Sequence, residues 1–81
     1  MRKKARKEYY RDEIFLKEIG ERIRSLRQEK EMSQMDLAFE CNEIDYSQIN
    51  RIELGKVNFS VSYLKIIAKA LEVSHLDLLP D

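Results

Sequence analysis

The stretch SQMDLAFECNEIDYSQINRIELGK, residues 33–56, contains the signals that decide the fold of this chain. Ser33 and Asp45 each follow directly after an apolar residue, and a second apolar residue stands four positions after each of them. Such a side chain accepts a hydrogen bond from a free amide in the first turn of a helix, while the two apolar residues pack together as a hydrophobic staple. The stretch therefore predicts two short helices, residues 34–41 and residues 46 to 53 or 54, joined by a short link.

The same start signal occurs twice more, at Ser60 and at Ser74, and predicts helices over residues 61–71 and 75–79. Pro80 cannot continue the last of these helices. Three of the four starts also have Asp or Gln at the third helical position, which predicts reciprocal capping boxes. These third residues are Asp36, Gln48 and Asp77.

The segment before Ser33 predicts one longer helix, residues 12–30, because its apolar residues recur at helical spacing. This apolar stripe consists of Phe15, Ile19, Ile23 and Leu26. The later helices have matching apolar faces, made of Leu37, Ala38, Cys41, Ile49, Ile52, Val61, Leu64, Ile67, Ala68 and Leu71. We therefore predict an all-α domain of five helices over residues 12–81. Residues 1–11 precede it as a basic arm or an extension of the first helix.

Composition excludes several other classes of protein. Gly20, Gly55 and Pro80 are the only glycines and proline, too few for a β-rich fold with a turn every ten residues or so. A lone cysteine, Cys41, cannot form an internal disulfide and suits a reducing compartment. No apolar run approaches the roughly 20 residues that span a bilayer, and the basic start lacks the apolar stretch of a secretory signal. We expect a cytoplasmic protein with no membrane association.

Charge is balanced overall but unevenly distributed. Residues 2–11 carry six basic side chains and one acidic side chain, whereas residues 12–81 carry nine basic and fourteen acidic ones. A basic arm of this kind suits a DNA backbone or minor groove, and it equally suits a solvated tail. The acidic balance of the remainder weakens non-specific attraction to DNA and suits a basic protein partner.

The short link between residues 34–41 and 46–53 forces the two helices to cross steeply, as in a helix-turn-helix. With Ile49 and Ile52 turned inward, the opposite side of the second helix stays at the surface. Asn there can pair with adenine and Arg with guanine in a major groove, although the same residues also suit a plain solvated face. The predicted base-contacting residues are Tyr46, Ser47, Asn50 and Arg51. The predicted DNA-backbone contacts are Gln34, Gln48, Lys56 and Asn58.

Three motifs together resemble the Cro/C1-repressor-like (Xre) family of helix-turn-helix proteins. They are Ser33-Gln34-x-Asp36-Leu37-Ala38, Ile49-Asn50-Arg51-Ile52-Glu53-x-Gly55-Lys56 and Leu64-x-x-Ile67-Ala68-x-Ala70-Leu71, within residues 19–79. The resemblance implies a five-helix, lambda-repressor-like domain that binds a palindromic operator as a homodimer and acts as a transcriptional regulator. It also implies that Gln34 contacts phosphate and that Arg27 and Glu53 form a structural salt bridge.

Two positions depart from the family pattern. Glu31 stands where the family has a glycine in a left-handed turn, a substitution that costs on the order of 1 kcal/mol if the turn is kept. The link from Cys41 to Ile49 is one residue longer than usual, with Asn42 in place of its glycine. Asn tolerates a left-handed conformation better than most residues. The extra residue can shift the register of the base contacts by one position.

An enzyme is not expected, since the chain has one histidine, His75, one cysteine and no glycine-rich phosphate loop. A zinc site needs four ligands, so we expect no metal and no cofactor. The alternative function is that of an antitoxin or adaptor whose main partner is a protein such as a toxin. Leu76 and Leu79 exceed what a short last helix can bury, which indicates a homodimer interface or closure of the monomer core.

Overall fold

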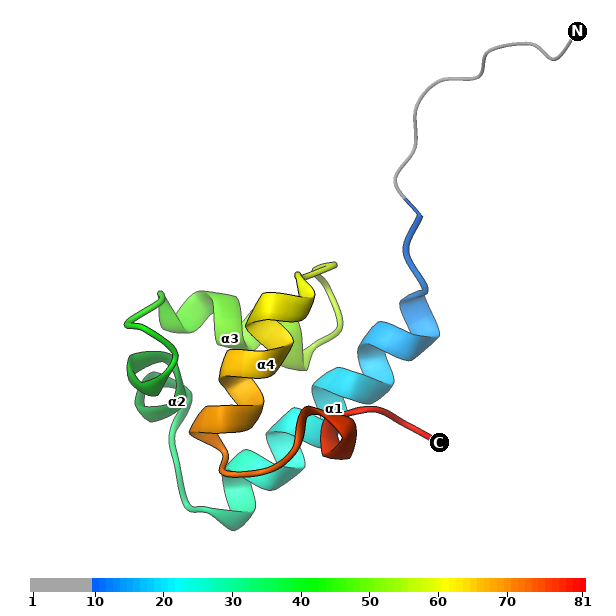
Figure 1. Cartoon of the computed structure of the whole chain (residues 1–81). Coiled ribbons are helices and arrows are strands. Elements are labelled where there is room, and N and C mark those ends of the chain that lie inside the picture. The colour runs from blue at the N-terminus through cyan, green and yellow to red at the C-terminus, as the bar shows by residue number, and fades with distance from the viewer. Residues whose placement is uncertain (1–9) are drawn as a thin grey trace, which may run out of the picture.

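The computed structural model describes residues 10–81, and most of the predicted arm lies outside the described residues. Four α-helices follow one another along the chain (Figure 1): α1 Glu13–Glu29, α2 Gln34–Glu40, α3 Tyr46–Glu53 and α4 Val61–Ala70. A single 3-10 turn, η1 His75–Leu78, ends the fold. Residues 10–81 contain no strand, so the all-α prediction is confirmed.

The prediction of a fifth α-helix is wrong. Leu79 is extended, with φ −91° and ψ 137°, as expected for a residue that precedes a proline. Only four residues then remain after the Ser74 cap, and they close through bonds between residues three apart, such as Leu79 N to Leu76 O at 3.2 Å. A segment this short adopts a 3-10 turn rather than an α-helix.

All four predicted helix starts are confirmed. Ser33, Asp45, Ser60 and Ser74 each accept a hydrogen bond from a backbone amide in the first turn that follows. Reciprocal capping boxes form at Asp36 and Asp77. The box predicted at Gln48 does not form: the Asp45 carboxylate accepts from the amide of Ser47, at 3.1 Å, and the amide of Gln48 donates to the carbonyl oxygen of Asp45, at 2.9 Å.

The core lies between the four helices and η1 and is made of aliphatic side chains. Its fully buried members with the largest volumes are Ile23, Leu37, Ile49, Ile67, Leu71 and Leu78. Two residues predicted to be inside are not: Phe15 is 40% exposed and Val61 is 81% exposed. Both lie in the first turn of their helix, where they line an open groove, and α1 buries Leu16 in place of Phe15.

Two glycines allow α1 and α3 to touch through their backbones. A Cβ on Gly20 would lie 2.4 Å from the carbonyl oxygen of Ile52. Gly55 follows α3 with φ +73°, and a Cβ there would lie 2.7 Å from Cα of Lys17. No larger residue fits at either position without moving the helices apart, so these contacts fix the position of α3 on α1.

Glu31 and Asn42, the two departures from the family pattern, are both left-handed, with φ 58° and 65°. Glu43 is also left-handed, with φ 57°, so two such residues in succession reverse the chain between α2 and α3. Within this link, Glu43 N donates to Phe39 O and Ile44 N donates to Ala38 O, both at 3.2 Å. The link therefore absorbs the extra residue, and α3 begins at Tyr46 as predicted.

Candidate nucleic-acid interface

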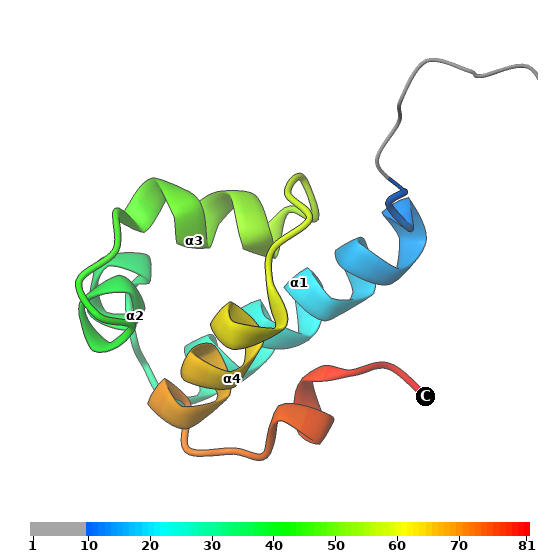
Figure 2. The ribbon, with the colours of Figure 1, turned by 45° about the horizontal axis from the view of Figure 1, so that its top comes forward.

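Helix α3 lies on the surface of the molecule, crossing α2 at its first turns and α1 at its end (Figures 1 and 2). Ile49, Ile52 and Glu53 face the interior. Tyr46, Asn50 and Arg51 are exposed and Ser47 is half-buried, so the predicted base-contacting residues share one accessible side of α3. The side chains available on this side are an amide, a guanidinium, a phenol and a hydroxyl.

Beneath that surface lies a buried ion pair between α1 and α3. Arg27 Nε lies 2.6 Å from Glu53 Oε2, and Arg27 Nη2 donates to Glu53 Oε1 at 3.1 Å. Arg27 Nη1 also donates to the carbonyl oxygen of Met32 at 2.7 Å. A paired, bidentate geometry of this kind gives charged groups fixed partners in a dry environment. The pair thus holds the end of α1, the α1–α2 link and α3 together.

Gln34 connects the buried ion pair to the exposed side of α3. Its Nε2 donates to Glu53 Oε1 at 3.0 Å and to Asn50 Oδ1 at 3.2 Å. A continuous chain of hydrogen bonds therefore runs from Arg27 through Glu53 and Gln34 to Asn50. It fixes the amide orientation of Asn50 and leaves its NH2 group available as a donor. The sequence placed Gln34 near phosphate but contained no signal for this bridge.

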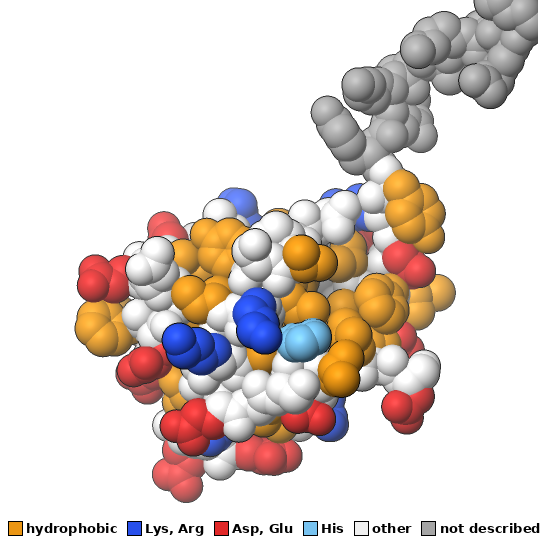
Figure 3. All heavy atoms as spheres, viewed as in Figure 1, with side chains coloured by type: hydrophobic (Ala, Val, Ile, Leu, Met, Phe, Trp, Pro, Cys, Tyr) orange, Lys and Arg blue, Asp and Glu red, His pale blue; other side chains and the backbone are white. Residues whose placement is uncertain are grey.

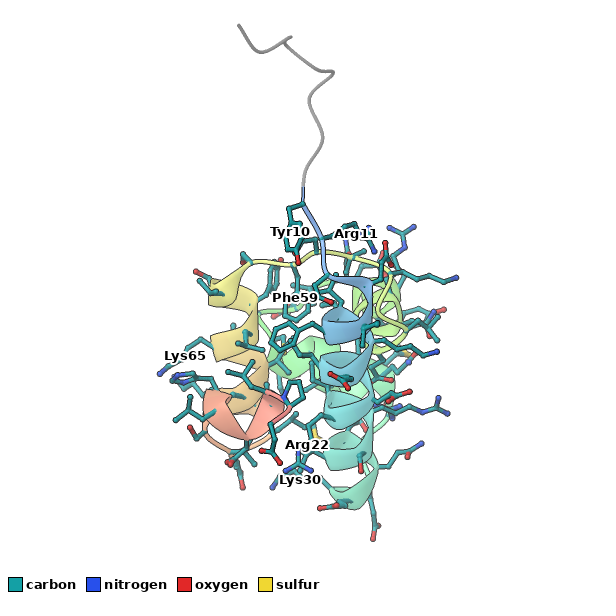
Figure 4. All side chains as sticks on the ribbon, turned by 90° about the vertical axis from the view of Figure 1, so that its right-hand side faces the viewer. Tyr10, Arg11, Arg22, Lys30, Phe59 and Lys65 are labelled. Atoms are coloured by element: carbon teal, nitrogen blue, oxygen red, sulfur yellow. The ribbon has the colours of Figure 1, made fainter. Side chains whose placement is uncertain are left out.

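The loop after α3 contains the remaining predicted backbone contacts. Lys56 is exposed, and its carbonyl oxygen accepts from Arg11 Nη2 at 3.1 Å. Asn58 Nδ2 donates to the carbonyl oxygen of Tyr10 at 3.0 Å. Asn58 therefore has an intramolecular partner that the sequence analysis missed. Figure 4 shows Tyr10 and Arg11 beside this loop, where the chain enters α1. Gln48 is exposed on α3.

A separate apolar groove of about 670 Å³ opens between the start of α1, α4 and η1. Figure 3 shows hydrophobic side chains gathered on this face of the molecule. Its apolar lining consists of Tyr10, Phe15, Leu16, Ile19, Phe59, Val61, Leu64, Leu76 and Leu79. Leu76 is 65% exposed and Leu79 is half-buried, whereas Leu78 between them is in the core. Of Leu76, Leu78 and Leu79, only Leu78 is therefore fully buried in the monomer core.

Two other kinds of site, a metal site and a reactive thiol, have little support among the residues that the structure describes. Between residues 10 and 81, no three His, Cys, Asp or Glu side chains are placed to hold a metal ion. Burial, and secondarily the charge of Glu40, raises the pKa of the Cys41 thiol to about 11. The thiol is therefore protonated at neutral pH and a poor nucleophile. No helix among these residues is long and apolar enough to cross a membrane.

Two crossed short helices with an accessible polar side on the second define a helix-turn-helix DNA-binding transcription regulator. The chain belongs to the helix-turn-helix family of the Cro/C1 (Xre) type, whose family model matches residues 23–78. No curated protein sequence is similar enough to this chain to match it.

Several solved structures have the same fold. The restriction-modification controller protein C.AhdI from Aeromonas hydrophila is 34% identical, with a TM-score of 0.76 over 79% of this chain and 96% of that one. The controller protein C.Esp1396I, solved as a tetramer with its natural 35 base-pair operator, is 36% identical, with a TM-score of 0.70 over 78% and 82%. A hypothetical transcription factor from Neisseria is 27% identical, with a TM-score of 0.75 over 94% and 87%.

Proposed function

We propose that this chain is a cytoplasmic homodimer that binds a palindromic operator through the major groove and represses transcription by occupying promoter DNA. The observation that carries the proposal is the hydrogen bond from Gln34 to Asn50, which holds an exposed amide of α3 in one orientation. A side chain fixed before binding loses less conformational entropy when it pairs with a base. The operator complex of C.Esp1396I adds support from a protein 36% identical to this one.

The proposal assigns the polar side of α3 to the bases. Asn50 and Arg51 are the principal readers, since Asn suits adenine and Arg suits guanine. Tyr46 and Ser47 stand at the start of the helix, which approaches base edges most closely. The proposed contacts with the DNA backbone are Gln34, Gln48, Lys56 and Asn58. Gln34 would use its main-chain amide at the start of α2, because its side-chain NH2 group donates to Glu53 and Asn50. No residue is assigned a catalytic role.

Dimerisation follows from the size of the module. One short helix reads only a few base pairs, so useful affinity requires two copies spaced about one helical turn apart. A two-fold dimer uses the same surface on both protomers. The apolar groove with Leu76 and Leu79 is our candidate for that surface, because exposed apolar side chains gather there.

Fluorescence anisotropy with DNA from upstream of the chain's own gene tests this function, with a random duplex as competitor. We expect specific, salt-sensitive binding that Arg51→Ala weakens by about 1–3 kcal/mol, because one bidentate base contact is lost. Lys69→Ala removes the same charge from an exposed position on α4 and is the matched control. Weak binding, equal on both duplexes and unaffected by Arg51→Ala, would point to a protein partner, such as a toxin, instead.

A further inference from the structure

We propose that Arg11 is a positioning residue for DNA binding. Its guanidinium holds the loop that follows α3, residues 54–60, and so fixes the place from which Lys56 reaches the phosphodiester backbone. This inference rests on the proposed DNA-binding function. It adds to that function a residue that acts through the loop and makes no DNA contact of its own.

Arg11 is bonded to two consecutive carbonyl groups just after α3. Its Nη2 donates to the carbonyl oxygen of Lys56 at 3.1 Å and to that of Gly55 at 3.5 Å. A little further along the loop, Asn58 Nδ2 donates to the carbonyl oxygen of Tyr10 at 3.0 Å. The partners are 44 to 48 positions apart in sequence, and Figure 4 shows Tyr10 and Arg11 beside the loop. Residues 10 and 11 therefore hold both halves of this loop.

The second half of the loop has few other polar restraints. No backbone amide of residues 57–60 donates to a backbone carbonyl oxygen within residues 10–81. Val57 and Phe59 are half-buried and pack against the core, whereas the residues on either side of Val57 are exposed. Apolar packing is not directional, so it fixes how deep the loop lies but not where its polar groups point. The bonds to residues 10 and 11 supply that direction.

Arg11 is itself held in place by the first turn of α1. Its Nε lies 3.1 Å from Glu13 Oε2. A guanidinium is planar, so a partner at Nε also sets the direction in which Nη2 donates. Its positive charge stands beside the end of α3, where the free carbonyl groups of a helix favour a cation. The start of α1 and the loop after α3 are thus joined through one oriented side chain.

A fixed loop matters for Lys56 because of the chemistry of lysine. The ammonium group is a point charge on a flexible four-carbon stem, so the position of the backbone decides which phosphates it can reach. A loop that is ordered before binding also loses less conformational entropy when it meets DNA. Without Arg11, Lys56 would keep its charge but lose the fixed point from which it reaches.

A double-mutant cycle separates positioning from direct contact. Arg11→Ala and Lys56→Ala are made singly and together, and each protein is titrated by fluorescence anisotropy with the upstream duplex that the full chain binds specifically. We expect Arg11→Ala to weaken binding about three- to tenfold in the full chain, the range of one charged contact. In the Lys56→Ala background its effect should fall below about twofold. An equal loss in both backgrounds would mean that Arg11 contacts DNA itself, and would overturn the positioning role.

Two further variants control for charge. Arg24→Ala removes the same charge from an exposed position on α1 and should change Kd by less than about twofold. A loss as large as that of Arg11→Ala would assign the effect to net charge and overturn the proposal. Arg11→Lys keeps the charge and one donor for the loop but loses the planar group that also pairs with Glu13, so it should restore binding only in part.

The order of the loop is measured on the free protein, without DNA. Nuclear magnetic resonance relaxation gives backbone order parameters for residues 56–59, which should fall in Arg11→Ala from about 0.85 to below about 0.6, while those of α3 and α4 stay unchanged. Unchanged order in the loop overturns the positioning role and leaves the proposed function intact if the full chain binds its operator. Absence of specific binding by the full chain overturns both.

Discussion

The two accessible faces of this small domain are built on opposite principles. On the α2–α3 face, a chain of hydrogen bonds from Arg27 through Glu53 and Gln34 holds Asn50. Among residues 10–81, no buried side-chain nitrogen or oxygen lacks a partner. On the α1–α4–η1 face, apolar side chains such as Val61 and Leu76 remain exposed around a groove. A face that reads DNA needs donors in known directions, whereas a face that meets another apolar surface needs only area and shape.

Helix α1 joins the two faces, because it provides Arg27 to the first and Phe15 to the second. Its contact with α3 at Gly20 leaves no room for a side chain. A disturbance of the polar network is therefore expected to destabilise the whole domain, while a change at the groove rim is expected to act on association alone.

The largest effect is expected from Glu53→Ala. It leaves the buried Arg27 guanidinium without its carboxylate partner, and removal of one member of a buried pair costs about 3–5 kcal/mol. Urea unfolding followed by circular dichroism measures the loss. A decrease below about 1 kcal/mol, the range of exposed pairs, would mean that the pair does not anchor the fold.

The double variant Arg27→Met with Glu53→Leu is the control for that experiment. Replacing a buried pair by apolar residues of similar volume is often neutral, so most of the stability should return. Specific DNA affinity should stay reduced, because Gln34 has lost the carboxylate that orients it toward Asn50. Full recovery of both properties would show that the network serves stability only.

An intermediate effect is expected at the apolar face from Leu76→Asp. Leu76 is exposed in the monomer, so the variant should fold with near-normal stability while the proposed dimer dissociates more readily. A charge placed in an apolar interface should raise the dimer dissociation constant at least tenfold, which corresponds to about 1.4 kcal/mol. Sedimentation velocity at several concentrations measures this shift.

Leu78→Asp is the matched control, since Leu78 is fully buried two positions later and its replacement should unfold the domain. Unchanged sedimentation of Leu76→Asp would remove the groove from consideration as the dimer surface. Unfolding of Leu76→Asp would instead assign this residue to the monomer core.

Whether a hydrogen bond could be predicted from the sequence depends on how far apart along the chain its two residues lie. The helix starts were predictable because each Ser or Asp cap lies only two or three residues from the backbone amide that donates to it. The pairing of Gln34 with Asn50 spans 16 positions and that of Arg11 with Lys56 spans 45, and no local pattern encodes either. The sequence therefore indicated which residues lie on the accessible side of α3 but not what orients them.

Exposure was hardest to predict at the helix ends. Periodicity places both Phe15 and Leu16 near the apolar stripe of α1, and only the position of the neighbouring helices decides which is buried. Val61 has the correct phase for the core of α4 but stands in its first turn, at the open groove. The last helical segment ends at Leu78, one residue earlier than predicted, because Pro80 disfavours the helical conformation at Leu79.

The smallest effects are expected where helices end in left-handed residues other than glycine. Glu31 follows α1 and Glu72 follows α4, with φ 58° and 61°. Glu31→Gly should stabilise the domain by up to about 1 kcal/mol, because glycine adopts this conformation without steric conflict. Glu72→Gly should gain less, since it also loses an exposed ion pair with Lys30 at 3.2 Å. Thermal unfolding measures both changes.

Glu21→Gly is the control with the opposite expected effect. Glycine at this exposed position inside α1 should lower the stability of the domain by about 1 kcal/mol. If Glu31→Gly also destabilises, the left-handed turn after α1 is not a source of strain, and the departure from the family's glycine is favourable. If it stabilises without altering DNA affinity, the turn is independent of the accessible side of α3. Stabilisation accompanied by weaker specific binding would instead mean that the turn influences the orientation of Gln34, because the Arg27 contact with Met32 lies directly beside it.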